Sequence, residues 1–293
     1  MTTQVRMDPY RQGSLMQHMR TPAAGQVFYV NTAAAGALDA NDGKTPQTAF
    51  LTIDYAVGQC NGGDDDYIFV IEHDNNAATF PIVVDEAQVH IIGAPETGRP
   101  LPQIRLDDNV DGFDVTAARV EIAGFVIDNG ADAYANNLVH VTGQGTHIHD
   151  NYIGWFFWAY NGVYADSDNN LINNNYFGAH GCANFAIYIA SGHGRTIVRD
   201  NVIVQDGYDT CVRGVDCASE NHCMIIDNKF QCAAAANGEA IYLSGPTNMA
   251  SGNEAAGLST GFGAFNPYLQ FLGEANSWGI NYAGATPTLP VVL

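Results

Sequence analysis

Basic residues are scarce in this sequence. Its 293 residues include 11 Lys and Arg against 31 Asp and Glu, which gives a formal net charge of −20. Nucleic acids and anionic membranes attract proteins through basic side chains. The composition therefore argues against both as partners. A regular Thr-x-Thr array is also missing, which argues against ice binding.

Long apolar runs are missing as well. No stretch approaches the roughly 20 consecutive apolar residues of a transmembrane helix, so we do not expect an integral membrane protein. The first 20 residues carry Arg6, Arg11 and Arg20 but no apolar core, and no secretory signal peptide is visible. Because the sequence starts with Met1, it favours a protein that is made and assembled in the cytosol.

The cysteines lack the paired Cys-x-x-Cys spacing that is typical of zinc sites. We expect them to be small buried apolar residues. A disulfide bridge or a soft metal site among the evenly spaced Cys211, Cys217 and Cys223 is the alternative. The six cysteines are Cys60, Cys182, Cys211, Cys217, Cys223 and Cys232.

What the sequence does contain is a short motif that recurs about every 25 residues through its second half. Each copy places an asparagine between two apolar residues. The spacing is too regular for chance and too short for a domain, so it predicts a solenoid. The copies are Ile148-x-x-Asn151-x-Ile153, Ile172-x-x-Asn175-x-Phe177, Val198-x-x-Asn201-x-Ile203 and Ile225-x-x-Asn228-x-Phe230, with a fainter copy at Asn253.

The motif predicts strands rather than helices, because apolar residues alternate with polar ones around each asparagine. A second apolar segment recurs once per repeat, and the turn formers Gly, Asn, Asp and Ser separate the segments. Stacking such coils pairs each strand with its copies in the neighbouring coils and produces long parallel sheets. The second segments are residues 139–141, 163–164, 187–189, 212–213 and 241–243.

The repeated asparagine has a physical role in such a fold. Asparagine tolerates a left-handed backbone at a tight bend, and its amide can hydrogen-bond to the equivalent bend of the next coil. We therefore expect a ladder formed by Asn151, Asn175, Asn201, Asn228 and Asn253.

With these repeats, the chain resembles the right-handed parallel β-helix proteins of the pectate-lyase-like superfamily, which includes many phage tailspikes and secreted polysaccharide lyases. The N-terminal part fits: residues 28–31 resemble the opening strand, 39–43 the acidic glycine turn, and 50–57 a short capping helix. Residues 66–70 and 89–93 resemble the first coil strands, with Phe125 in the asparagine position of a later coil. The resemblance implies an all-β, right-handed, single-stranded parallel β-helix.

Composition and pattern together predict one elongated domain with two appendages. Residues 1–25 form a short basic arm, residues 26–253 form the β-helix, and residues 254–293 form a cap. Aromatic residues are frequent in this last segment. Because a β-helix must protect its open end, we expect the cap to double as an oligomer contact.

Enzymes that act on sugars need acidic groups on the outside of the coils. A glycosidase uses two carboxylates roughly 5–9.5 Å apart, and a lyase of the resembled superfamily combines calcium with a basic residue. The candidate catalytic residues are Asp206, Asp209, Arg213 and Asp216. Solvated acidic turns are the alternative interpretation. Apart from calcium in the lyase case and the alternative soft metal site among the cysteines, the sequence predicts neither a cofactor nor a metal site.

Outward-facing residues of successive coils predict a binding or interface surface. The predicted row consists of His140, Tyr164, Tyr188, Arg213 and Tyr242, with Asp114 at its start. Such a row could stack against sugar rings or against another protomer, or it could simply stabilise the sheet. Trp155 and Trp158 belong to a run of four large aromatics that cannot all enter one core, so we expect a ligand, a loop or another chain to cover some of them.

Two function classes compete at this point. The first is a structural virion-type protein, a phage head decoration or a tail spike or fibre. It would be a homotrimer held to other virion proteins by residues 1–25, with a face that binds a glycan or receptor. The second is a polysaccharide lyase or glycoside hydrolase that acts on an extracellular polysaccharide. The sequence favours the first, without enzymatic activity, because its catalytic candidates are few.

Overall fold

A computed structural model describes most of the chain. The described residues are 25–73, 79–106, 109–130, 135–154, 159–178, 182–205, 213–218, 222–232, 239–257, 268–270, 276–283, 286–288 and 291–292. The predicted arm, except residue 25, lies outside them, and so do Trp155, Trp158, Asp206 and Asp209. No helix in the described ranges is long and apolar enough to cross a membrane.

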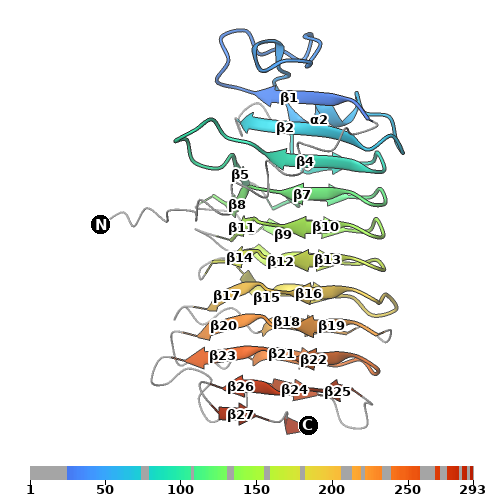
Figure 1. The fold of residues 1–293 in the computed structure, drawn as a ribbon, viewed down its shortest axis with the longest axis vertical. Helices are drawn as coiled ribbons and strands as arrows, with labels where there is room; N and C mark the ends of the chain where they lie inside the picture. Colours follow the sequence, from blue (N-terminus) through green and yellow to red (C-terminus); the bar gives the residue numbers. More distant parts are fainter. Residues whose placement is uncertain are drawn as a thin grey trace.

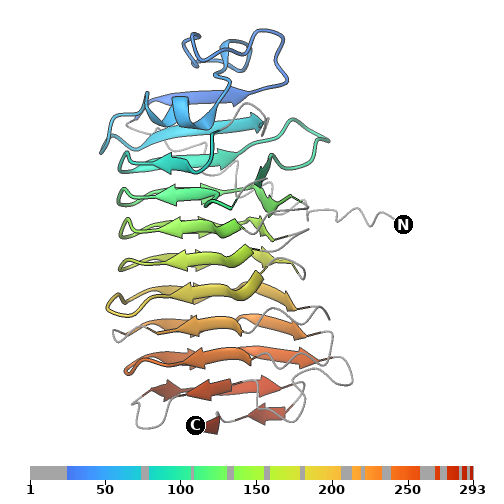
Figure 2. The same cartoon turned by 180° about the vertical axis from the view of Figure 1, so that it is seen from behind.

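The chain winds into a parallel β-solenoid, as the repeat predicts. Its strands stack coil upon coil from β1 at one end to β25 and β26 near the other (Figures 1 and 2). Each typical coil contributes one short strand to each of three sheets, here called sheets A, C and B in the order in which the chain visits them. The predicted all-β parallel fold is therefore confirmed.

The strands of the three sheets have the following bounds. Sheet A contains β1 (Val27–Asn31), β2 (Asp66–Glu72), β4 (Val89–Gly93), β7 (Glu121–Ala123), β10 (His147–His149), β13 (Leu171–Asn173), β16 (Ile197–Arg199), β19 (Met224–Ile226), β22 (Met249–Ser251) and β25 (Ser277–Trp278). Sheet C contains β5 (Gln103–Leu106), β8 (Val126–Asn129), β11 (Tyr152–Ile153), β14 (Tyr176–Phe177), β17 (Val202–Gln205), β20 (Lys229–Cys232), β23 (Glu254–Gly257), β26 (Asn281–Ala283) and β27 (Thr286–Thr288). Sheet B contains β3 (Ile82–Val84), β6 (Phe113–Val115), β9 (Ala135–Val141), β12 (Ala159–Ala165), β15 (Cys182–Ile189), β18 (Arg213–Cys217), β21 (Glu239–Leu243), β24 (Tyr268–Gln270) and β28 (Val291–Val292).

The N-terminal end is closed by the short helix that the sequence predicts. After a 3-10 turn, η1 (Pro46–Thr48), helix α2 (Ile53–Val57) begins at Thr52, whose side chain accepts a hydrogen bond from the amide of Tyr55. This cap satisfies one of the free amides at the start of the helix. Its apolar face is buried in the same core as the coils, and the helix lies beside β1 and β2 (Figure 1).

Columns of aliphatic side chains fill the interior. One column runs through the middle residues of the sheet A strands, where each residue pairs with its equivalent in the next coil. Burying each such side chain stabilises the fold by about 1.5–3 kcal/mol. Its members are completely buried: Ile91, Ile122, Ile148, Ile172, Val198, Ile225 and Ala250.

An asparagine ladder occupies the corner between sheets A and C. The amide Nδ2 of Asn175, for example, donates to Oδ1 of Asn201 at 3.1 Å and to the carbonyl of Ile148 at 2.9 Å. Equivalent bonds link Asn151 to Asn175. The ladder also contains Asn228, Asn253 and Asn281, and the amide of Phe125 donates to Asn151 at its beginning.

One detail of the expected ladder is wrong. The left-handed backbone belongs to the residue before each asparagine, with φ of 55° at Asp150, 57° at Asn174 and 55° at Asp200. The preceding residue makes the bend, and the asparagine is thereby left to bond to the neighbouring coils. The corner between sheets B and A follows the same rule, since Oδ1 of Asn170 accepts from the amide of Thr146 and Asn169 before it has a φ of 62°.

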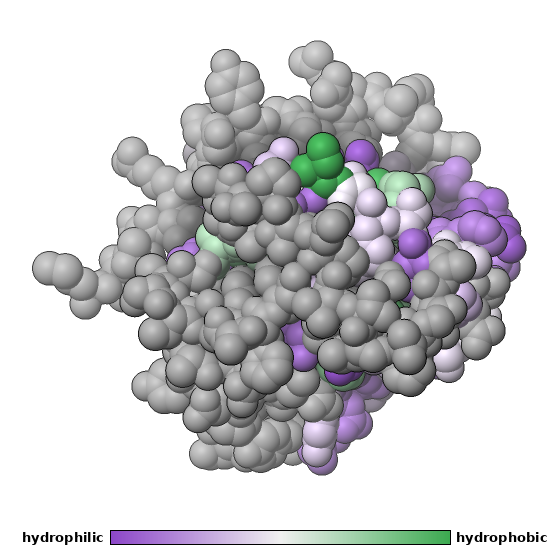
Figure 3. Space-filling view, turned by 90° about the horizontal axis from the view of Figure 1, so that it is seen from below, coloured by the Kyte–Doolittle hydropathy of each residue, from purple (hydrophilic) through white to green (hydrophobic). Residues whose placement is uncertain are grey.

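The three sheets continue into the segment predicted as a cap. Strands β23 to β26 extend them beyond residue 253, and β26 and β27 pair antiparallel. Tyr268 is completely buried here, and its hydroxyl donates to the carbonyl of Tyr282 at 2.7 Å. Figure 3 looks onto this end, where much of the described surface is hydrophilic. Ile280, however, is 63% exposed.

Candidate functional site

The outer face of sheet B carries a continuous row of aromatic and charged side chains, here called the sheet B row. The paired residues of successive coils are Asp114, His140, Tyr164, Tyr188, Asp216 and Tyr242. The predicted place of Arg213 in this row is wrong, because Val215 is the residue that pairs with the buried Ile187. Arg213 instead lies opposite Phe185.

The rings of the sheet B row stack on one another. The centroids of His140 and Tyr164 are 5.1 Å apart with an interplanar angle of 7°, and those of Tyr164 and Tyr188 are 5.3 Å apart with an angle of 22°. Ring faces in such a stack are turned toward neighbouring rings. A ligand on this surface would therefore meet ring edges and hydroxyl groups rather than open ring faces.

Arg213 ties together the C-terminal part of the row. Its Nη1 lies 2.5 Å from Oδ2 of Asp216, and its Nε lies 3.1 Å from Oε2 of Glu239. The guanidinium also covers the ring of Tyr242 at 3.9 Å. Burial raises the pKa of Asp216, while the charge of Arg213 opposes that shift. Two of the four catalytic candidates, Arg213 and Asp216, are thus brought together as an ion pair.

Two histidines, one on strand β9 of sheet B and one in the turn after β15, lie beside carboxylates. Nδ1 of His140 lies 3.4 Å from Oδ2 of Asp111 and 3.4 Å from Oδ1 of Asp114. The hydrogen bond with Asp111 raises the pKa of His140 above its usual value, although burial opposes the shift. Further along, Nε2 of His193 lies 3.3 Å from Oδ1 of Asp166.

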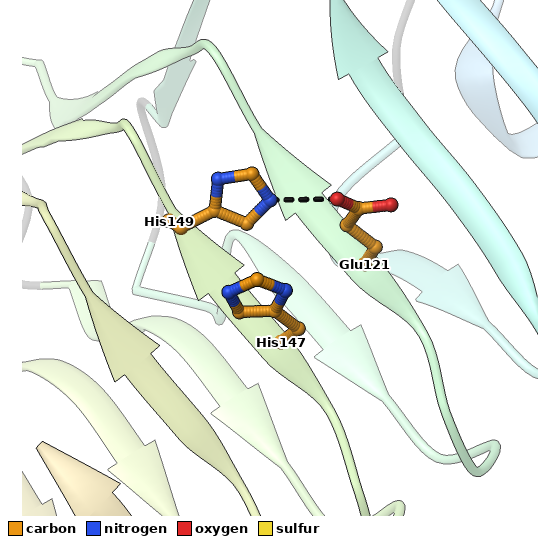
Figure 4. Close-up of side chains that lie close together, drawn as sticks. All are labelled: Glu121, His147 and His149. Atoms are coloured by element: carbon orange, nitrogen blue, oxygen red, sulfur yellow. Dashed lines mark hydrogen bonds and ion pairs between the residues drawn. The ribbon is translucent and has the colours of Figure 1, made fainter. Parts of the chain in front are cut away.

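A denser cluster, which the sequence analysis did not single out, lies on the outer face of sheet A. His90 of β4, Glu121 of β7 and His147 of β10 pair in register on successive strands. His149 follows two residues after His147 and therefore points to the same face. Glu121, His147 and His149, here called the sheet A triad, each offer one ligand atom within 4.8 Å of the others (Figure 4).

Hydrogen bonds hold the sheet A triad in place. Nε2 of His149 lies 2.7 Å from Oε1 of Glu121 and its Nδ1 lies 2.7 Å from Oδ2 of Asp150. The other carboxylate oxygen of Glu121 lies 2.5 Å from Nδ1 of His90. Nε2 of His147 lies 2.6 Å from Oδ1 of Asn173, and the rings of His147 and His149 stack with centroids 4.0 Å apart.

Burial gives the three groups different protonation behaviour. Burial lowers the pKa of His149, but its bonds to Asp150 and Glu121 more than offset this and raise the value to about 9. Burial and the nearby His149 lower the pKa of His147 to about 4. Burial raises the pKa of Glu121, but the bonds from His149 and His90 hold it well below its usual range. At pH 7, His147 is therefore neutral and His149 is protonated, beside the ionised carboxylate of Glu121.

A signal for the triad does exist in the sequence. The segment His147-Ile148-His149 alternates polar and apolar residues, so a strand must place both imidazoles on one face. Glu121 occupies the same position in the coil before, ahead of Ile122. Finding it required the coil register, because Glu121 lies in a coil without the asparagine.

Comparison with known proteins adds no family to this description. No protein-family model matches the sequence, and a search of curated proteins finds no match either. The class that the structure itself defines is a parallel β-solenoid, with the sheet A triad and the sheet B row on its outer faces.

Proposed function

We propose that this chain is a structural β-helix of the virion type, a head-decoration or tail protein that presents the outer face of sheet B to a glycan or receptor. The observation that carries the proposal is the sheet B row, a line of half-buried rings and charged groups in register along several coils. Tyrosine is among the residue types that are enriched at the hot spots of binding surfaces.

The geometry favours recognition through hydrogen bonds. Stacked rings keep Tyr164 and Tyr188 in fixed positions, so little side-chain entropy is lost when a ligand binds their edges. Their hydroxyl groups can both donate and accept hydrogen bonds. A polymer that lies along the solenoid axis would meet these two hydroxyls on adjacent coils, about 4.8 Å apart.

The test is a comparison of binding and cleavage on a panel of acidic and neutral polysaccharides. We expect a polysaccharide that binds the full chain without releasing reducing ends. The double variant Tyr164→Phe with Tyr188→Phe keeps the stack and removes the hydroxyls, and it should bind at least 10-fold more weakly. The matched control is Tyr152→Phe with Tyr176→Phe, a ring pair on sheet C with centroids 4.5 Å apart, which should bind like the wild type. Equal loss in both variants would contradict this use of sheet B.

The virion part of the proposal has its own test. A homotrimer would have a mass of 94.2 kDa, three times the 31.4 kDa of the chain, and light scattering measures it directly. In the proposed assembly, residues 1–25 attach the chain to other virion proteins. Deleting them should abolish attachment to the parent particle while the β-helix stays folded. If the shortened chain still attaches to the particle, residues 1–25 are not the anchor.

An enzyme that acts on polysaccharide is the second candidate, because one observation favours it. Arg213 holds the carboxylates of Asp216 and Glu239 on adjacent strands, and paired carboxylates are what glycoside hydrolysis requires. Burial raises the pKa of Asp216, as a general acid requires. Depolymerisation that is abolished by both Asp216→Asn and Glu239→Gln would establish this alternative.

A further inference from the structure

Each residue of the sheet A triad forms a hydrogen bond with a separate partner outside the triad, unlike the residues of an ordinary surface ion pair. Asp150 holds Nδ1 of His149, and Asn173 holds Nε2 of His147. His90 holds Oε2 of Glu121. Protein metal sites typically have such outer partners, which fix the tautomer and direction of each ligand.

These outer contacts leave one atom on each member of the triad. The remaining atoms are Nε2 of His149 and Oε1 of Glu121, which lie 2.7 Å apart, and Nδ1 of His147. Figure 4 shows the two imidazoles side by side with the carboxylate directed toward them. The side chains are also sheltered, with 11% of His149 and 9% of Glu121 exposed.

We propose that Glu121, His147 and His149 form a binding site for a divalent transition metal ion, zinc first, on the outer face of sheet A. Two imidazole nitrogens and one carboxylate oxygen are a common zinc ligand set, with a fourth position left for water or another ligand. The inference does not depend on the proposed function of sheet B.

The distances suit zinc after small side-chain movements, once the proton between Nε2 of His149 and Oε1 of Glu121 has left to solvent. Zinc ligands lie about 2.0–2.2 Å from the ion in a tetrahedral arrangement, which places neighbouring ligand atoms roughly 3.4 Å apart. The ligand atoms of the triad already lie within 4.8 Å of one another. Calcium and magnesium take oxygen ligands, so two histidines select against both.

A metal ion at this site would join two coils. Glu121 is on β7, whereas His147 and His149 are on the adjacent β10. A bridge between neighbouring coils adds to the contacts that hold a solenoid together, because each coil contacts only its neighbours. Zinc should therefore raise the unfolding temperature as well as bind.

The experiment is calorimetric titration of the chelator-treated full chain with ZnCl2 alone. We expect one site per chain with a dissociation constant in the micromolar range or tighter. It should be unaffected by an excess of Ca²⁺, and saturating zinc should raise the unfolding temperature. Co²⁺ at the same site should give visible absorption bands, which report nitrogen and oxygen ligands directly.

Substitutions test whether the ion binds at the triad. His147→Ala with His149→Ala should weaken binding at least 100-fold and abolish the cobalt bands. The matched control is His140→Ala with His193→Ala, which removes two histidines that also lie beside carboxylates but outside the triad, one on β9 and one in the turn after β15; it should bind zinc like the wild type. Asp150→Asn leaves all three ligands intact and should weaken binding 10- to 100-fold.

The outcomes separate clearly. A wild-type chain that takes up no zinc below millimolar concentration overturns the proposal, and so does a triad variant that binds as tightly as the wild type. If the triad variant fails to fold, the zinc affinity and the cobalt spectrum of the Asp150→Asn variant test the proposal instead. An unchanged affinity in Asp150→Asn then counts against the site.

Discussion

The asparagine corner and the sheet B row are both ladders with one residue per coil, yet they are built differently. In the corner, the same residue recurs from Asn151 to Asn281, because its amide must bond to backbone groups that repeat in every coil. In the sheet B row, the residue changes at almost every coil, from Asp114 to His140 to Tyr164. A side chain that bonds to the repeating backbone must itself repeat. A side chain that faces outward is free to vary, and function can be built there.

The largest expected effect on stability comes from a substitution in the asparagine corner. Asn201→Ala removes four hydrogen bonds, two donated by Asn201 and two that it accepts from Asn175. At about 1 kcal/mol each, the free energy of unfolding should fall by about 4 kcal/mol in urea titrations. Asn136→Ala, at an exposed position of β9, is the control and should change it by less than about 0.5 kcal/mol. Equal effects of the two substitutions would mean that the corner contributes no more than the surface.

The second prediction concerns the ion pair between Arg213 and Asp216 of the sheet B row. Arg213→Ala leaves the carboxylate of Asp216, which is 4% exposed, without its cation. We expect the free energy of unfolding to fall by about 3 kcal/mol. Adding Asp216→Asn to this variant removes the buried charge and should restore part of the loss. If the second substitution restores nothing, the buried charge is not the cause.

The third prediction separates the ring from the hydroxyl in the sheet B row. Tyr164→Ala removes two stacking contacts, to His140 and to Tyr188, each worth about 0.5–1.5 kcal/mol. Thermal or urea unfolding should therefore show a loss of about 2 kcal/mol. Tyr164→Phe keeps both contacts and should change stability by less than about 0.5 kcal/mol. A large loss in the phenylalanine variant would show that the hydroxyl, and not the stack, stabilises the row.

The smallest expected effect is a pH dependence at His140. Its pKa is higher in the folded chain than in the unfolded one, because of Asp111 and despite burial. Its contribution to stability is thus complete below the unfolded pKa of about 6.5 and is lost as the pH rises through the folded value. His140→Gln should remove this dependence, which amounts to less than about 1 kcal/mol because the pair is partly exposed. Urea unfolding of both proteins at pH 6 and pH 8 measures the difference, and identical differences would exclude His140 as its source.

Prediction from the sequence succeeded where residues repeat and failed where they do not. The period of the asparagine motif was sufficient for the parallel coils, whereas helix α2 was predicted from the resemblance of residues 50–57 to the opening of the pectate-lyase-like superfamily. The register of β18 was predicted incorrectly by three residues, since Val212 and Val215 are equally apolar and only the packing beside Ile187 distinguishes them. The sheet A triad was not predicted, because residues at this outward position do not repeat from coil to coil and only the pairing of β7 with β10 brings Glu121 beside the two histidines.

The sequence by itself therefore determined the coil, its period and the asparagines of the corner between sheets A and C, because those side chains bond to a backbone geometry that is the same in every turn. Only the tertiary structure decided which outward side chains meet. Glu121 and His149 are separated by 28 positions in the chain, and their contact depends on the exact length of the coil between them. Stacking of the coils brings the two residues together only when the coil has this length. A change of one residue in the coil would move one of the two side chains to the opposite face of the sheet.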